Sequence, residues 1–284
     1  LIRGLCGLHQ QGLALLDEGI ADARRMPTEY LEACGLLHRS EVLLAAGNDK
    51  AARNDLESGM RLLHRNGYRH FWAWHPGAMT RSLTRSVQYG YESAFARTLA
   101  AERLHLSLLD DGTAIPHLEI HVLGGIRVSR QGIPILEAET LTPLQRELLA
   151  LLLAAPGLKL PQESICLHFW PESPQDTVRI KFDTLISRLR KTLAESLSDN
   201  TASFYLNREK GMLWLAHCRI DSHMFVDGVK QGMMHYRLQE FWQAGNMFAA
   251  IAPLWQGEFA PGVAGDDRVR HFRDSLNASL SEMA

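Results

Sequence analysis

The sequence predicts a mainly α protein with a small β component. Apolar residues recur at helical spacing up to about residue 109, alternate with polar residues from residue 118, and return to helical spacing in three capped segments that a hairpin follows. A chain of 284 residues is long enough for two or three domains. We therefore expect helical repeats over 1–110, a linker at 111–117, a compact domain over 118–220 and a helical segment over 221–284.

The composition is typical of a globular protein, with 46% hydrophobic and 22% charged residues. The net charge of −2 means that any surface for nucleic acid must come from local clustering. Four cysteines without a CxxC pair disfavour a zinc site and a disulfide framework. No apolar run is long enough to span a membrane, and the opening residues do not form a signal sequence. We predict a cytoplasmic protein with no cofactor, no metal and no membrane contact, and because it begins at Leu1 we expect a longer parent protein.

The first part predicts paired helices. The stretch "LEACGLLHRSEVLLAAGNDKAARNDLESGMRLLHRNGY" (31–68) has the pattern helix, turn, helix, and further breaks are expected near 26–28 and 89–90. Small residues mark positions where two helices could approach closely, and these are Ala33, Ala45, Ala51 and Ala52. Such a pattern is typical of a helical-hairpin repeat of roughly 34 residues.

The compact domain is predicted to begin with a sheet. "DDGTAIPH" (110–117) has the composition of a linker, and "LEIHVLGGIRVSRQGIPILEAE" then alternates apolar and polar residues between Gly-containing turns. This pattern predicts three or four antiparallel strands.

Three helices and a hairpin should follow. "TPLQ" (142–145) is a capping box with proline at the first helical position, and it opens a helix whose core stripe is Leu144, Leu148, Leu149 and Leu152. A short helix is expected around 162–170, a long one over 174–197, and a hairpin over 203–216 with its tip at 208–211.

The long third helix has two different faces. At 100° per residue, one arc is apolar and should be buried, and it contains Val178, Phe182, Leu185, Ile186, Leu189, Leu193 and Leu197. The opposite face carries Ile180, Thr184, Ser187 and Lys191. Residues 177–191 hold five cations and one carboxylate, a local charge of +4. Short outward side chains flanked by cations suit insertion into a DNA major groove, although a solvated helix face is the simpler reading of an isolated basic helix.

The order of sheet, three helices and closing hairpin is the plan of a winged helix, in which the third helix reads the groove and the hairpin contacts the DNA backbone. Residues 118–220 resemble the winged-helix DNA-binding domain of the OmpR/PhoB type, in the form that precedes a bacterial transcriptional activator domain. The matching segments are "LEIHVLGGIRVSRQG", "LLALLLAAPGLKLPQESICLHFWPESP", "DTLISRLRKTL" and "CRIDSHMF". "APLWQGEFAPGV" and "DDRVRHFRDSL" resemble the start of that activator domain, of which about 60 residues are present.

The first hundred residues are similar to the tetratricopeptide-like helices that precede such domains in regulators of the MalT-like ATPase type. No GxxxxGK[ST] phosphate loop occurs in the chain. The resemblance therefore implies an ATPase module upstream of Leu1.

The predicted DNA-binding residues lie on the third helix and the hairpin. They are Arg179, Lys181, Thr184, Ser187, Arg188, Arg190, Lys191, Asn207, Arg208 and Lys210. The resemblance and the helical wheel place Arg188 toward the groove, whereas Arg190 lies near the core edge and is assigned to a phosphate or to an intramolecular ion pair. The hairpin "NREKGMLWL" departs from the usual "GxGYRF", so only phosphate contacts are expected of it.

Other constellations carry no chemistry that we can assign. His64, His70 and His75 do not share a helix face, and the neighbouring Phe71, Trp72 and Trp74 are expected to pack between repeats. Cys166 and Trp170 are expected on the buried side of the domain, and no base or paired carboxylates support catalysis.

The sequence thus predicts a sequence-specific transcriptional regulator, not an enzyme, whose helical repeats sense a signal or bind a partner. Its expected partners are double-stranded DNA, RNA polymerase or another protein, and a second copy of itself on DNA. The alternative is a protein-interaction scaffold whose winged helix is a docking surface. Residues 221–284 favour that alternative, because five cations against eight acids give them a charge of −3.

Overall fold

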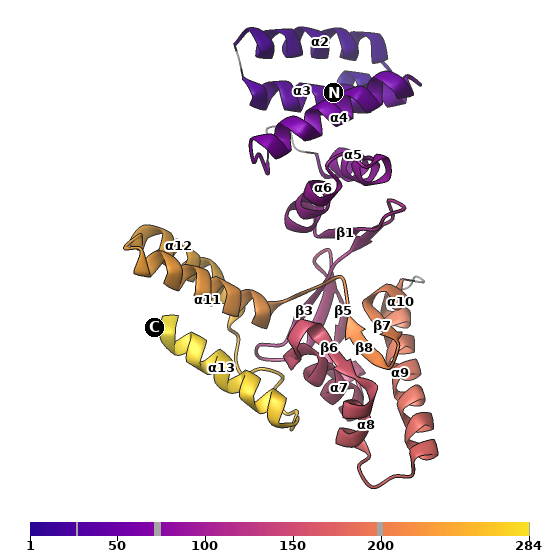
Figure 1. The fold of residues 1–284 in the computed structure, drawn as a ribbon, viewed down its shortest axis with the longest axis vertical. Coiled ribbons are helices and arrows are strands. Elements are labelled where there is room, and N and C mark those ends of the chain that lie inside the picture. The colour runs from indigo at the N-terminus through magenta and orange to yellow at the C-terminus, as the bar shows by residue number, and fades with distance from the viewer. Residues whose placement is uncertain (27, 71–74, 198–200, 284) are drawn as a thin grey trace. The chain divides into compact units, whose positions relative to one another are not determined.

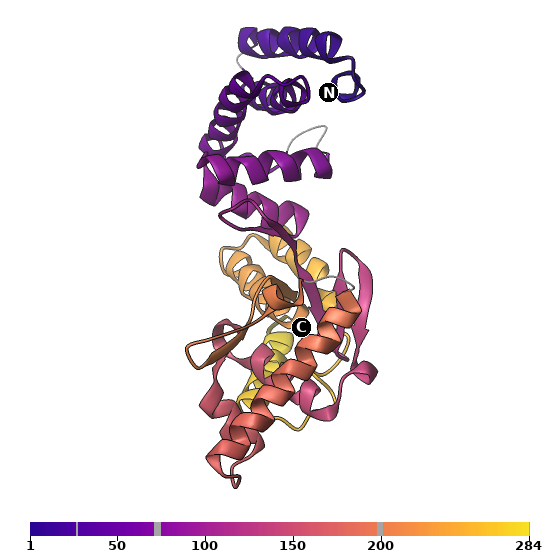
Figure 2. The ribbon, with the colours of Figure 1, turned by 90° about the vertical axis from the view of Figure 1, so that its right-hand side faces the viewer.

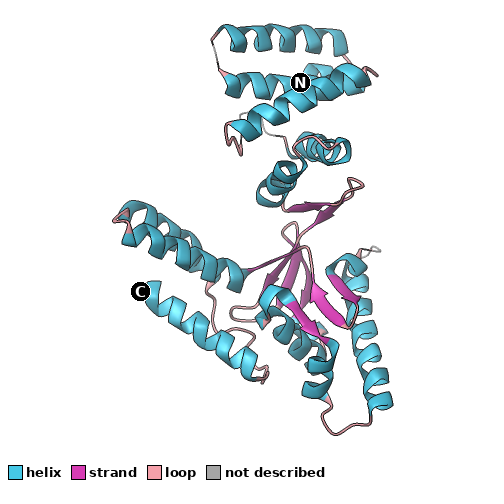
Figure 3. Cartoon of the chain, viewed as in Figure 1, coloured by secondary structure: helices cyan, strands magenta, loops and turns pink. Residues whose placement is uncertain are grey.

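The computed structural model describes residues 1–26, 28–70, 75–197 and 201–283. The chain divides into two compact units, Leu1–Pro116 and His117–Ala284. Helices predominate in both units, and the strands are short (Figure 3). The mainly α fold with a small β component is therefore confirmed. A further division of the second unit at residue 220 stays a prediction.

The N-terminal unit is a stack of helices (Figure 1). Its helices are α1 (Ile2–Leu5), α2 (His9–Arg25), α3 (Glu29–Ala45), α4 (Asp49–Arg65), α5 (Pro76–Tyr89) and α6 (Ser93–Leu99), which a π-helical turn (Ala100–Leu104) extends. The helices end close to the breaks expected from the sequence. Asn48 caps α4 by accepting a hydrogen bond from the Ala51 backbone N–H at 3.3 Å.

Glycines set the closest contacts between these helices. A Cβ atom at Gly59 of α4 would lie 2.9 Å from Cγ of Leu37 on α3, and one at Gly35 would lie 2.6 Å from Cγ1 of Ile20 on α2. Such distances leave no room for even a methyl group, so the absence of a side chain allows the helices to touch.

The alanines that the sequence assigns to these contacts divide into two groups. Ala33 and Ala52 are buried and Ala51 is half-buried, but Ala45 is exposed. The prediction for Ala45 is wrong because α3 ends at this residue and the chain turns there.

A hairpin closes the N-terminal unit. β1 (Leu106–Leu108) pairs antiparallel with β2 (Ala114–Pro116) in the register Leu106↔Pro116. This segment was expected as the end of a helix and a linker at 111–117. His105 instead ends the helical path with a φ of 54°, and Leu106, Leu108 and Ile115 are buried. Burial of these apolar side chains explains why the segment is part of the unit.

The C-terminal unit contains a four-stranded sheet in the order β5-β4-β3-β9. Its strands are β3 (Leu118–His121), β4 (Arg127–Arg130), β5 (Ile133–Glu137) and β9 (Cys218–Ile220). β3, β4 and β5 pair antiparallel as expected, and β9 pairs parallel with β3 in the register Leu118↔Cys218. The expectation of an all-antiparallel sheet is wrong in its fourth strand, which comes from the far end of the domain.

Three helices follow the first strands, after a 3-10 turn at Ala138–Thr140. They are α7 (Pro143–Ala154), α8 (Gln162–Phe169) and α9 (Gln175–Leu197), with a second 3-10 turn at Pro156–Leu158. The capping box of α7 is confirmed, because Gln145 Oε1 accepts a hydrogen bond from the Thr142 backbone N–H at 2.8 Å and the Thr142 hydroxyl accepts one from the Gln145 N–H. Leu144 is 43% exposed, so its place in the core stripe is wrong.

A small second sheet, in the order β6-β8-β7, completes the winged helix-turn-helix arrangement. Its strands are β6 (Lys159–Pro161), β7 (Leu206–Glu209) and β8 (Met212–Leu215), and α10 (Ala202–Tyr205) precedes β7. We call the β7–β8 hairpin, residues 206–215, the wing. Its turn is Lys210 and Gly211, both at positive φ. The first strand begins at Leu206 rather than at the predicted residue 203, because α10 extends to Tyr205.

The remaining residues form α11 (Asp221–Arg237), α12 (Phe241–Ile251), a 3-10 turn (Ala252–Leu254) and α13 (Asp267–Met283). Asp221 joins α11 to the four-stranded sheet. Its buried carboxylate accepts hydrogen bonds from the backbone N–H groups of Val122 (2.9 Å) and Leu123 (3.1 Å). Burial raises the pKa of this carboxyl, and the N–H groups that donate to it act in the opposite direction. This contact could not be predicted from the sequence, because its partners are separated by about a hundred residues.

Candidate nucleic-acid interface

Helix α9 runs along the outside of the C-terminal unit (Figure 2), and its residues divide into one buried and one exposed face. Its buried residues are Phe182, Leu185, Ile186, Leu189, Leu193 and Leu197. Val178, the seventh residue predicted for this face, is half-buried. The outward residues Ile180, Thr184, Ser187 and Lys191 are all exposed. The two faces therefore lie where the helical periodicity places them.

Arg179 and Arg188 are the cations of this face that are available to a ligand. Both are exposed, and neither guanidinium has a hydrogen-bond or ion-pair partner in the described part of the chain; the Arg188 backbone carbonyl accepts a hydrogen bond from the Thr192 hydroxyl at 3.0 Å. A guanidinium that the protein leaves unpaired can form bidentate hydrogen bonds to guanine or to a phosphate.

Two lysines on α9 have weak intramolecular partners. Lys181 Nζ donates to the Ser173 hydroxyl at 3.0 Å, and Lys191 Nζ lies 3.7 Å from Oε1 of Glu195. Exposed contacts of this kind contribute little to stability. Both lysines can therefore exchange these partners for a phosphate at small cost.

Arg190 has an intramolecular partner that the sequence did not identify. Its Nε and Nη2 atoms donate to the backbone carbonyl of Leu206 at 3.2 and 3.0 Å, and its side chain is half-buried. The partner is a carbonyl at the start of the wing, so this contact is not the expected ion pair, and the alternative contact with a DNA phosphate stays a prediction. The bonds to Leu206 fix the wing to α9.

Arg208 also joins the wing to the helices. Its Nη1 donates to Oδ1 of Asp183 at 2.5 Å, its Nη2 donates to Oε1 of Gln162 at 2.9 Å, and its guanidinium lies 4.9 Å from the ring centroid of Phe182. The sequence assigned Arg208 to DNA phosphates and did not identify Asp183 or Gln162. No local pattern could have identified these partners, since Arg208, Asp183 and Gln162 lie on three separate elements, β7, α9 and α8.

The turn of the wing is more open. Lys210 has a side chain that is 88% exposed, and its Nζ lies 3.2 Å from Oε1 of Glu209. Asn207 is half-buried, and its Nδ2 donates to the Phe204 carbonyl at 2.9 Å. Lys210 is therefore better placed than Asn207 to reach a phosphate.

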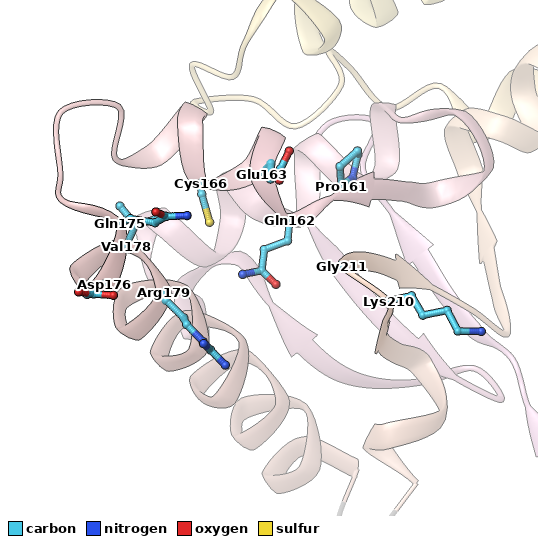
Figure 4. A pocket seen from close by; sticks show the side chains of 10 residues that line it. All are labelled: Pro161, Gln162, Glu163, Cys166, Gln175, Asp176, Val178, Arg179, Lys210 and Gly211. Carbon is cyan, nitrogen blue, oxygen red and sulfur yellow. The ribbon is translucent and has the colours of Figure 1, made fainter.

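Three hollows border this surface, and one of them is lined by Trp170. The hollow of about 790 Å³ lies between α8, the first turn of α9 and the turn of the wing, and Arg179, Gln162, Cys166 and Lys210 are among its lining residues (Figure 4). A second hollow of about 480 Å³ lies along the outward face of α9. Its lining residues are Ile180, Asp183, Thr184, Ser187 and Arg188.

The remaining candidates do not form a second site. Cys166 is half-buried rather than fully buried, and burial raises the pKa of its thiol, which disfavours the reactive thiolate. Trp170 is also half-buried and lines a hollow of about 310 Å³ together with Leu144 and Ile180. Neither residue is the fully buried core residue that the sequence predicts.

The three histidines considered as metal ligands in the N-terminal unit have separate partners. His64 Nδ1 lies 2.5 Å from Glu92 Oε2, His75 Nδ1 accepts from the Ala78 backbone N–H, and His70 Nδ1 lies 2.9 Å from Arg103 Nη2. Phe71, Trp72 and Trp74 lie outside the described residues. Within the described ranges, no cluster of three or more His, Cys, Asp or Glu side chains could hold a metal ion. No described helix combines the length and the apolar character that a membrane span requires.

Comparisons with known proteins give limited information. No protein-family model matches the chain, and no curated protein matches it at the significance required. Among solved structures, Mycobacterium tuberculosis EmbR in complex with a low-affinity phosphopeptide is similar, with 22% sequence identity and a TM-score of 0.42 over 58% of this chain. The match covers 41% of the EmbR chain, so this chain corresponds to less than half of that protein. A likeness at this level does not establish a family or a function.

Proposed function

We propose that the chain is a sequence-specific DNA-binding transcriptional regulator without enzymatic activity of its own. In this proposal α9 enters the major groove, the wing contacts the DNA backbone, and the helical N-terminal unit senses a signal or binds a partner. The observation that carries it is the outward face of α9, where Arg179 and Arg188 are exposed and unpaired among the described residues and flank the short side chains of Thr184 and Ser187.

Charge supports the same assignment. Residues 177–191 carry a charge of +4 in a chain whose net charge is −2, so the cations are concentrated on this helix. Phosphate contacts release counterions, and the affinity for DNA should therefore fall steeply as salt rises. Arg179, Lys181, Lys191 and Lys210 are the residues that we assign to phosphates.

A protein-interaction scaffold is the second candidate. One observation favours it: Leu238, Phe241 and Trp242, where α11 meets α12, are 63%, 59% and 78% exposed. A group of large exposed apolar side chains is typical of a protein-binding surface. If the chain is a transcriptional regulator, the same surface would bind RNA polymerase, another protein or a second copy of the chain.

Quantitative binding to DNA separates the two candidates. Gel shifts of the full chain on genomic fragments at two salt concentrations should retain a specific complex at the higher salt, whereas a scaffold would give none. On the selected site, Arg188→Ala should weaken binding by about 1–3 kcal/mol and relax the preference at one base pair. Lys210→Ala is the matched control, because it should weaken binding to all sequences about equally. Equal losses on specific and random DNA for Arg188→Ala would contradict the proposal.

A further inference from the structure

Ile180 is an apolar residue on a face that is otherwise polar. It is 67% exposed, and it is the only large apolar side chain among the exposed hydrophobic residues of α9, every residue of which is described. A single exposed isoleucine is common on protein surfaces and carries no conclusion by itself. Its position beside Thr184 and Arg188 on the same side of the helix distinguishes it from such a residue.

Ile180, Thr184 and Arg188 follow one another at intervals of four residues, so they lie along one side of the helix. All three line the hollow on the outward face of α9. The Thr184 hydroxyl donates to the Ile180 carbonyl at 2.8 Å, so its hydrogen is already used within the helix. Ile180 therefore offers apolar contact to this hollow, and the neighbouring Thr184 hydroxyl has no free hydrogen to donate.

Major-groove chemistry offers one apolar group to such a surface, the 5-methyl group of thymine. Contact between this methyl group and an exposed isoleucine removes both from water, which is favourable. Ile180 and Arg188 are eight residues apart, about 12 Å along the helix axis, and this length corresponds to roughly three to four base pairs.

We propose that Ile180 determines specificity by contacting the 5-methyl group of a thymine, about three to four base pairs from the guanine that Arg188 binds. This inference rests on the proposed function, since it requires α9 to lie in the major groove. It adds an apolar contact to the cations and hydroxyl residues that the sequence assigned to DNA.

The test is a double-mutant cycle between the protein side chain and the thymine methyl group. A duplex selected from a random library by the full-length chain is prepared with deoxyuridine replacing each thymine in turn, which removes only the methyl group. Fluorescence anisotropy then gives Kd for the wild-type chain and for Ile180→Ala. At one thymine the wild type should lose about fourfold in affinity, the factor that corresponds to about 0.8 kcal/mol for one buried methyl-sized group.

Ile180→Ala should bind the thymine duplex about as weakly as the wild type binds the deoxyuridine duplex, and should no longer distinguish the two. Ile133→Ala is the matched control, because Ile133 on β5 is 65% exposed and lies outside α9. This control should distinguish thymine from deoxyuridine as the wild type does. Circular dichroism melting verifies that both variants are folded.

The possible outcomes separate this inference from the proposed function. If the wild type selects a specific duplex but Ile180→Ala keeps every deoxyuridine effect, the inference is overturned and the proposed function stands. If Ile180→Ala instead loses only the capture of a protein partner, the inference is also overturned. If the wild type selects no duplex, the proposed function fails and this inference fails with it.

Discussion

The Nη1 atom of Arg208 lies 2.5 Å from Oδ1 of Asp183, so the wing and α9 are joined by an ion pair. Both side chains are partly exposed, and the bond contributes little to stability for that reason. Its larger effect is on charge, because Asp183 neutralises a guanidinium that could otherwise reach a DNA phosphate.

Replacement of Asp183 should release Arg208 toward DNA. We expect Asp183→Asn to tighten binding to random DNA and to steepen the slope of log Kd against log salt by about 0.9, the increment for one additional phosphate contact. Titrations of the full chain at several salt concentrations measure this slope. The double variant Asp183→Asn with Arg208→Gln should lose the added slope, and an unchanged slope in Asp183→Asn would mean that Arg208 stays on the protein.

Arg190 should matter for folding rather than for direct contact with DNA. Arg190→Ala removes both hydrogen bonds to the Leu206 carbonyl, and bonds to a charged donor contribute about 1.5–3 kcal/mol each in favourable cases. Because the two bonds share one acceptor, we expect a total loss of about 2 kcal/mol in the free energy of unfolding, measured by urea denaturation.

Lys191→Ala is the control for this measurement. Lys191 is exposed on the same helix, and its Nζ lies 3.7 Å from the exposed carboxylate of Glu195, so its removal should change stability by less than about 0.5 kcal/mol. Equal stability of the two variants would show that the Leu206 carbonyl finds another donor.

Much of the fold could be predicted because its signals are local. The two faces of α9 follow from the 3.6-residue period, and the start of α7 follows from Thr142, Pro143 and Gln145. These features depend on residues within a few turns of one another. Their prediction therefore required no knowledge of the rest of the chain.

The missed features depend on partners that are distant in sequence. Strand β9 pairs with β3 although the two strands are about a hundred residues apart in the sequence. The Asp221 carboxylate accepts a hydrogen bond from the Val122 backbone N–H over a similar sequence separation. Arg190 and Arg208 look like DNA-contacting cations in the sequence, but each has a partner from another element. Charge and spacing define which residues can bind DNA, and tertiary contacts decide which of these are free to do so.

The prediction of the buried leucines of α7 was wrong at one position for a related reason. Leu144 belongs to the apolar stripe by spacing, yet it lies in the first turn of the helix, where no neighbouring element covers it fully. Instead it lines a hollow with Trp170 and Ile180. Periodicity gives the direction of a side chain, but burial also requires a neighbour at that height along the helix.

The N-terminal unit should lose stability in mild acid because of His38. This histidine on α3 is 8% exposed, and burial lowers its pKa to about 4. In the unfolded chain the pKa is about 6.5, so between these two values the unfolded state binds more protons than the folded state. The stabilisation is fully present above about pH 6.5 and is lost as the pH falls toward 4.

The expected slope is at most about 1.4 kcal/mol per pH unit, and the total loss across this range is about 3 kcal/mol. Urea denaturation of the full chain between pH 7 and pH 4.5 measures the free energy of unfolding. Hydrogen exchange at amides of α3 and α4 then shows whether the N-terminal unit is the part that loses stability.

His38→Gln should lower stability at pH 7 but flatten its dependence on pH, because the titrating group is gone. His271→Gln, at an exposed position on α13, should keep the wild-type dependence. If the stability of His38→Gln depended on pH as strongly as that of the wild type, groups other than His38 would cause the acid sensitivity.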